Sequence, residues 1–97
     1  LSDELFLSTI IDFMRDVDDK AGFQSNSIRV DRLLYGPKTP GRIFAISENE
    51  LFERLDRLKD LTNGGLYVSE TAGMVQLYKD ENYFDASYLE NKWLNNE

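Results

Sequence analysis

The sequence predicts a small α+β domain, and three features carry this prediction. Apolar residues recur at helical spacing in two long segments, near residues 3–19 and 48–61. Two strand-like runs follow the second segment and flank a glycine, which is the pattern of a β-hairpin. The chain has 97 residues, 41% of them hydrophobic, and this suits a single domain over 1–97 with one buried core.

The first element is predicted to be a helix that begins after a cap at Ser2 or Asp3. Acidic residues in its first turn suit the positive end of the helix dipole. Its apolar stripe is broad enough to contact more than one other element. The stripe consists of Phe6, Leu7, Ile10, Ile11, Phe13, Met14 and Val17.

Shorter elements are predicted between the two long helices. Ile28–Val30 has β-branched residues at both apolar positions and is predicted to be a short strand. Asp31 is predicted to cap one or two helical turns that end at Gly36. Gly36–Gly41 holds both prolines of the chain and two glycines, so it is predicted to be a loop.

The clearest element is a helix that begins with a capping box, Ser47 with Glu50. Leucines at positions 51, 55 and 58 mark its buried face. On its other side Glu50 precedes Arg54 by four residues and Glu53 precedes Arg57 by four, the favourable order for helical ion pairs.

A β-hairpin and a terminal helix are predicted to follow. The hairpin strands are Leu66–Glu70 and Met74–Tyr78, joined by the three-residue loop Thr71–Gly73. Asp85 is predicted to cap a short final helix. The complete order predicts a winged-helix-like domain: a three-helix core with a short strand, a C-terminal hairpin wing and a terminal helix. The predicted loop of about seven residues after the second helix is longer than the usual helix-turn-helix connection.

The net charge of -7 is unevenly distributed along the chain. Residues 1–19 carry one cation and six carboxylates. Residues 80–97 carry one cation and five carboxylates. Residues 20–79 carry nine cations against seven carboxylates, so the segment of the expected helix-turn-helix and wing is mildly basic. The acidic ends therefore weaken the case for nucleic-acid binding without removing it.

Five cations in the basic middle segment are candidates for nucleic-acid contact. A winged helix binds DNA through its third helix and its wing, and a loop before a helix can contact phosphate. Acidic residues alternate with the cations of the long helix, so an ion-paired, solvated face is the alternative. The candidates are Lys38, Arg42, Arg54, Arg57 and Lys59.

Aromatic residues are concentrated in the last third of the chain. Carboxylates rather than cations accompany them, which favours core packing and a protein-contact surface over a platform for nucleic-acid bases. Tyrosine and tryptophan dominate the binding energy of many protein interfaces. The candidate interface residues are Tyr83, Phe84, Tyr88 and Trp93.

The absence of cysteine and histidine excludes several classes of chemistry. Disulfide frameworks, thiol nucleophiles, Ser-His-Asp triads and ordinary transition-metal sites all need these residues. We therefore expect a domain that is not an enzyme and uses no cofactor or metal.

No apolar run reaches the roughly 20 residues of a membrane span, and the chain opens with Leu1. We expect one domain of a longer, cytoplasmic protein with no membrane contact.

Three stretches of the chain together resemble a known family. They are Gly36–Phe44, the leucine-rich helix that ends in Leu61-Thr62, and Glu70–Tyr78. They resemble the C-terminal part of an uncharacterised bacterial family encoded near phosphorothioate DNA-modification and restriction genes, over about residues 28–78. The resemblance implies a bacterial defence protein that acts on DNA or on DNA-modifying partners, and it supplies no catalytic residues.

Two functions are consistent with these observations. The first is a non-catalytic accessory module of a DNA-modification or restriction system that contacts DNA through the third helix and the wing. The alternative is a protein-interaction module that docks a partner, or a neighbouring domain, through its acidic, aromatic C-terminal segment.

Overall fold

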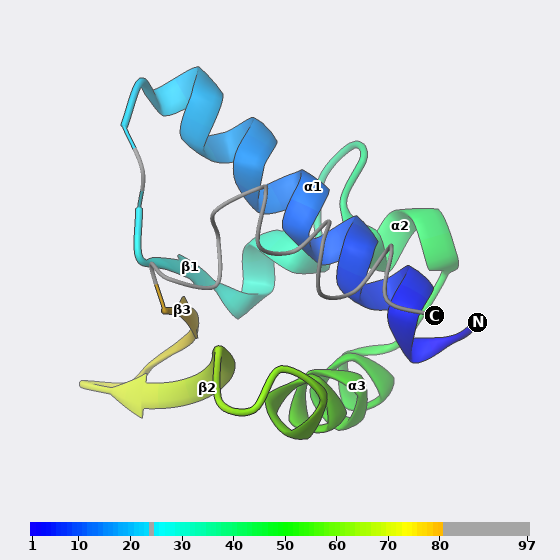
Figure 1. The fold of residues 1–97 in the computed structure, drawn as a ribbon. Helices are drawn as coiled ribbons and strands as arrows, with labels where there is room; N and C mark the ends of the chain where they lie inside the picture. The colour runs from blue at the N-terminus through cyan, green and yellow to red at the C-terminus, as the bar shows by residue number, and fades with distance from the viewer. Residues whose placement is uncertain (24, 81–97) are drawn as a thin grey trace.

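Three α-helices and a three-stranded antiparallel sheet make up the part of the chain that the structure, a computed structural model, describes: residues 1–23 and 25–80. In Figure 1 the strands lie together at one edge of the molecule and the α-helices fill the rest. The α+β class predicted from the sequence is confirmed. In chain order the elements are α1 (Asp3–Ala21), β1 (Ser27–Arg29), the 3₁₀ helix η1 (Val30–Leu33), α2 (Pro40–Phe44), α3 (Glu48–Leu61), β2 (Leu66–Thr71) and β3 (Met74–Lys79).

Helix α1 forms as its cap and its apolar stripe predict. The Ser2 hydroxyl accepts a hydrogen bond from the Leu5 backbone N–H at 3.1 Å, which satisfies one of the free donors of the first turn. The stripe buries Phe6, Ile10 and Met14 almost completely. Because the stripe is wide, α1 contacts both α2 and α3, as expected.

The strands are arranged in the order β1-β3-β2, so β3 is central. Strand β1 pairs with β3 and places Ile28 opposite Leu77. The predicted strand Ile28–Val30 is therefore shifted by one residue, because Val30 already begins η1.

The hairpin turn is shorter than predicted. Thr71 pairs with Met74, so Ala72 and Gly73 alone form the turn, and the predicted three-residue loop is wrong. Both turn residues have a positive φ, 55° and 79° respectively. Two-residue turns of this kind have a twist that matches the twist of the strands they join.

The segment before α3 differs most from the prediction. The turns expected from Asp31 to Gly36 form the 3₁₀ helix η1, which already ends at Leu33. The loop predicted over Gly36–Gly41 also ends early, because Pro40 is the first residue of α2. Proline suits that position, where no N–H is needed and its fixed φ is already helical. Only three residues then separate α2 from α3.

Helix α3 has the predicted cap and the predicted buried face. The Ser47 hydroxyl accepts from the Glu50 backbone N–H at 3.2 Å. Leu51, Leu55 and Leu58 are completely buried. They join side chains from α1, η1 and the sheet in a single core of Phe6, Leu7, Ile10, Ile11, Met14, Ile28, Val30, Leu33, Leu34, Leu51, Leu55, Leu58, Leu66 and Leu77.

Candidate functional site

The Arg54 side chain is held between α3 and the start of α1 and is only 14% exposed. Its Nε donates to Glu50 Oε2 at 3.0 Å, as the sequence predicts, and its Nη1 lies 3.5 Å from Asp3 Oδ1. Nη1 also donates to the Leu1 carbonyl oxygen at 3.4 Å, and the guanidinium carbon lies 5.8 Å from the Phe6 ring centroid. These contacts leave little of the guanidinium available to an incoming nucleic acid.

Arg57 binds the same carboxylate. Its Nε donates to Asp3 at 3.2 Å from Oδ2 and 3.3 Å from Oδ1, while its side chain is 48% exposed. The expected pair with Glu53 is not among the described ion pairs, because Arg57 turns toward α1 instead. Asp3 therefore bridges the two α3 arginines and offsets positive charge that a phosphate would otherwise contact.

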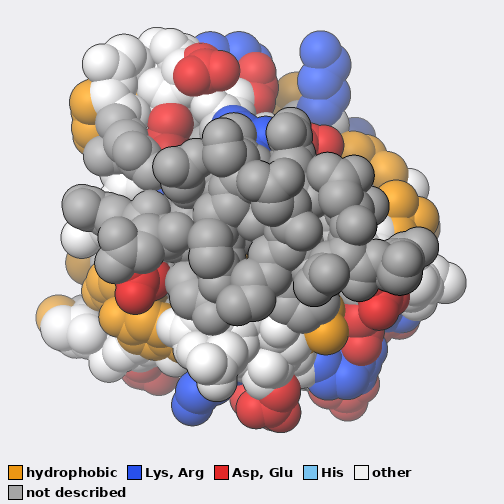
Figure 2. Space-filling view, in the orientation of Figure 1, with side chains coloured by type: hydrophobic (Ala, Val, Ile, Leu, Met, Phe, Trp, Pro, Cys, Tyr) orange, Lys and Arg blue, Asp and Glu red, His pale blue; other side chains and the backbone are white. Residues whose placement is uncertain are grey.

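The solvent-facing side of α3 is acidic. Glu53, Asp56 and Asp60 are exposed and follow one another at intervals of three and four residues, so they share the face opposite the buried leucines. We call these three residues the α3 acidic face. Figure 2 shows acidic side chains, with Lys or Arg side chains among them, along the lower rim of the view, where α3 lies in Figure 1. A helix that enters a DNA groove would bring this face nearest to the phosphates, which repel it.

Lys38, Arg42 and Lys59 differ from the α3 arginines, because all three are exposed and take part in none of the described ion pairs. They come from the loop before α2, from α2 and from α3. Lys38 lines grooves beside Phe13 of α1, and Arg42 lies on α2. Lys59 is five residues beyond Arg54 and is turned about 140° around α3.

The hairpin offers no exposed cation. Lys79 is the only Lys or Arg between residues 66 and 79, and its side chain is 2% exposed. Its ammonium group pairs with the Asp18 carboxylate of α1. The other Asp18 oxygen accepts the Ser25 N–H at 3.1 Å. Lys79 thus ties the end of the hairpin to the end of α1.

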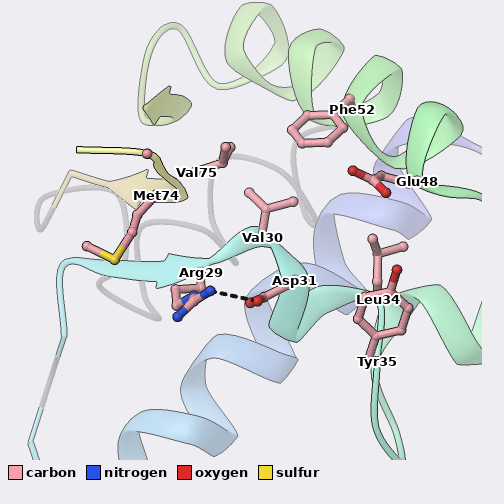
Figure 3. Close-up of a pocket in the computed structure, with 10 residues that line it drawn as sticks. Arg29, Val30, Asp31, Leu34, Tyr35, Glu48, Phe52, Met74 and Val75 are labelled. Atoms are coloured by element: carbon pink, nitrogen blue, oxygen red, sulfur yellow. Dashed lines mark hydrogen bonds and ion pairs between the residues drawn. The ribbon is translucent and has the colours of Figure 1, made fainter. Parts of the chain in front are cut away.

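A notch opens between η1, the start of α3 and the hairpin (Figure 3). It encloses about 200 Å³. Its apolar lining comes from Val30, Leu34, Phe52, Met74 and Val75, and its polar lining from Arg29, Asp31, Tyr35 and Glu48. Arg29 donates to Asp31 at 3.0 Å, which leaves Glu48 as the carboxylate of the notch without a described ion pair.

No group of three or more potential metal ligands occurs among residues 1–23 and 25–80. None of the described helices combines the length and the apolar character that crossing a bilayer requires.

Two predictions for the C-terminal segment lie outside the described residues. They are the helix after Asp85 and the interface residues Tyr83, Phe84, Tyr88 and Trp93.

Comparison with known proteins assigns the chain to a family. Residues 1–96 match the family described as protein of unknown function (DUF4007). The chain belongs to the DUF4007 family. The expected membership of an uncharacterised family is therefore confirmed, over a longer stretch than the residues that suggested it. No curated protein and no solved structure matches this DUF4007 chain.

Two features of this DUF4007 domain differ from what the local sequence pattern predicts. The sequence predicts that Asp3 stabilises the first turn of a helix through the helix dipole. In the structure it also binds two arginines more than fifty positions away. Nothing in the local pattern indicates such a contact. The acidic face of α3, by contrast, is visible in the sequence when each charged residue is placed at its angle around the helix axis. The net charge of the helix does not show it.

Proposed function

We propose that this DUF4007 domain is a non-catalytic protein-interaction module with a winged-helix-like architecture, and that its partner presents a basic surface to the α3 acidic face. The observation that carries the proposal is the arrangement of charge on α3. Its outward side holds Glu53, Asp56 and Asp60, while Arg54 and Arg57 are turned to Asp3. Such a surface complements cations and repels phosphates.

The order and spacing of the elements support the winged-helix-like assignment. Helices α2 and α3 are separated by three residues, the connection length of a helix-turn-helix. The β2–β3 hairpin directly follows α3 and takes the place of a wing, and β1 completes its sheet beside β3. The shortness of α2, five residues, is the main departure from that arrangement.

The lack of cations on the hairpin also favours a protein partner. A wing that follows a DNA backbone needs exposed Lys or Arg, and the strands and turn of this hairpin present none. An accessory role in DNA modification, which the family resemblance suggests, is compatible with this proposal, since such a module can bind the modifying proteins rather than the DNA.

Charge reversal of the acidic face tests the proposal. The full chain and its E53K/D56K/D60K variant are used to retain proteins from a lysate of the native cells, and a retained partner is purified for binding measurements. We expect the variant to lose the partner, and the affinity of the unaltered domain to fall with salt. Retention of the same partner with equal affinity by the variant would contradict the proposal.

The matched control reverses the same number of charges elsewhere. Asp12, Asp19 and Glu70 are exposed and belong to none of the described ion pairs, so D12K/D19K/E70K changes the net charge equally while leaving α3 intact. This control should keep the partner. Equal loss in both variants would mean that only net charge matters.

Duplex DNA is the second ligand to test, because Lys38, Arg42 and Lys59 remain exposed. We expect no mobility-shift complex at low salt with protein concentrations on the order of 10 µM, within the range of non-specific DNA binding. A complex that is lost on Arg57→Ala or Arg42→Ala would favour the DNA-contacting function instead.

Trp93→Ala tests the predicted role of the C-terminal aromatic residues. Its binding is measured with the protein partner of the charge-reversal experiment.

A further inference from the structure

The notch beside α3 has the size of one side chain. At about 200 Å³ it is smaller than the pockets that hold cofactors or drug-sized ligands, which start at roughly 300 Å³. Its floor is apolar and built from residues of the core margin, Val30 and Leu34, which are 3% and 9% exposed. Its position is fixed by three elements of the fold, so the notch exists before any partner binds.

The chemistry of the notch is that of a receptor for a cation on an apolar stem. In Figure 3, Glu48 lies between Phe52 and Tyr35, and Leu34 lies beside Tyr35. A carboxylate between two aromatic rings attracts a cation through its charge and through the ring faces. Arg29 lies on the other side of the view, where Asp31 pairs with it at 3.0 Å.

The charge balance of the notch favours the same occupant. Among the residues that the structure describes, one cation and two carboxylates line it, and the Arg29–Asp31 pair accounts for the cation and one of the carboxylates. Glu48 supplies the remaining charge and is exposed to solvent. An incoming carboxylate or phosphate would therefore meet net negative charge, while a lysine or arginine would meet its complement.

We infer that this notch binds an arginine side chain of the partner protein, with the guanidinium at Glu48 between Phe52 and Tyr35 and the aliphatic stem against Val30 and Leu34. Arginine fits better than lysine, because its planar group can stack on an aromatic ring and bind a carboxylate at the same time. The inference rests on the proposed function. It names the anchor of a basic partner whose remaining cations face the α3 acidic face, on the same helix as Glu48.

The experiment uses the full chain labelled with ¹⁵N and an acetylated, amidated Gly-Gly-Arg-Gly-Gly peptide as the probe. Amide shifts should change at Leu34, Phe52 and Val75, with a dissociation constant on the order of 1 mM, as expected of a single side chain. The same peptide with citrulline, the neutral isostere of arginine, should bind at least about threefold more weakly. Equal binding of both peptides would overturn the inference.

Two variants with a matched control locate the site. Glu48→Gln should weaken arginine binding about threefold, since it removes one charge and keeps the shape of the side chain. Tyr35→Leu, at a residue that is 69% exposed, should weaken it about twofold. Glu53→Gln removes a charge from the same helix outside the notch and should leave the affinity unchanged. An equal loss in Glu53→Gln and Glu48→Gln would show diffuse attraction only and would overturn the assignment.

Failure of this inference is separable from failure of the proposed function. If the arginine peptide shifts no residue of the notch while the E53K/D56K/D60K variant still loses its partner, the notch assignment falls alone. If the peptide binds the notch but no partner depends on the α3 acidic face, the proposed function falls and the arginine site stands as measured.

Discussion

Gly41 is the position where the fold leaves least room for a side chain, and Gly41→Ala tests that packing. An ideal Cβ at this position would lie 2.8 Å from the Leu34 Cα and 3.0 Å from both the Leu33 and Leu34 carbonyl oxygens. Carbon atoms in good contact are separated by about 3.5–4.0 Å, so the new methyl group is too close by about 1 Å. The atoms it meets belong to the backbone and cannot rotate away.

The two contributions to this substitution have opposite signs, which makes the experiment informative. Alanine is favoured over glycine in a helix by about 1 kcal/mol, so α2 by itself would gain stability. Overpacking costs about 1–3 kcal/mol, and the upper part of that range applies because α2 and the end of η1 must move apart. We expect a net loss of about 2 kcal/mol in the free energy of unfolding.

Urea denaturation and thermal melting followed by circular dichroism measure the effect. For a domain of this length, a loss of about 2 kcal/mol lowers Tm by roughly 8–16 °C. Arg42→Ala is the control, because it introduces the same residue at the next, exposed position of α2 and should change stability by less than about 0.5 kcal/mol. A Gly41→Ala protein as stable as the unaltered one would refute the packing argument.

Three further substitutions have expected effects on the free energy of unfolding, each measured by urea denaturation. Ala72→Asn should stabilise the domain by about 0.5–1 kcal/mol, because asparagine tolerates the positive φ of the turn better; a loss of stability would contradict this assignment. Thr62→Val should cost about 1–3 kcal/mol, since the buried Thr62 hydroxyl accepts the Leu66 N–H at 2.9 Å; a change below about 0.5 kcal/mol would refute it. Asp18→Asn should cost about 1.5–3 kcal/mol, because it replaces the charged hydrogen bond to the Lys79 ammonium with a neutral one; an unchanged urea midpoint would show that the pair is not needed.

The sequence predicts helices well where local pattern and burial agree. Ser2 and Ser47 cap α1 and α3 as expected, and the leucines of α3 are buried as their spacing predicts. The error lies between these helices, where the sequence predicts a loop that includes Pro40. Its fixed φ permits either a loop or the first turn of a helix, and the local signal for the helix is Thr39, whose hydroxyl caps α2 by accepting the Arg42 N–H.

The candidate site was predicted less well, because its charges are set by contacts between distant segments. The sequence places Arg57 opposite Glu53, its neighbour on the helix, but the shared carboxylate comes from Asp3. Local rules describe pairs three or four residues apart and carry no information about a contact made when α1 packs on α3. Such contacts decide how far each cation is exposed and which carboxylate offsets its charge.

The structure brings together charges that are far apart in the sequence. The acidic start and the basic middle are not two independent surfaces, since Asp3 pairs with both Arg54 and Arg57 and Asp18 pairs with Lys79. Each contact uses a carboxylate of α1 to offset a cation of α3 or the hairpin. The carboxylates of α3 then dominate its outward side, although the segment as a whole is mildly basic. Asp3→Asn should remove the charge that offsets Arg57 and raise the affinity for duplex DNA at low salt, while the matched Asp12→Asn variant should not.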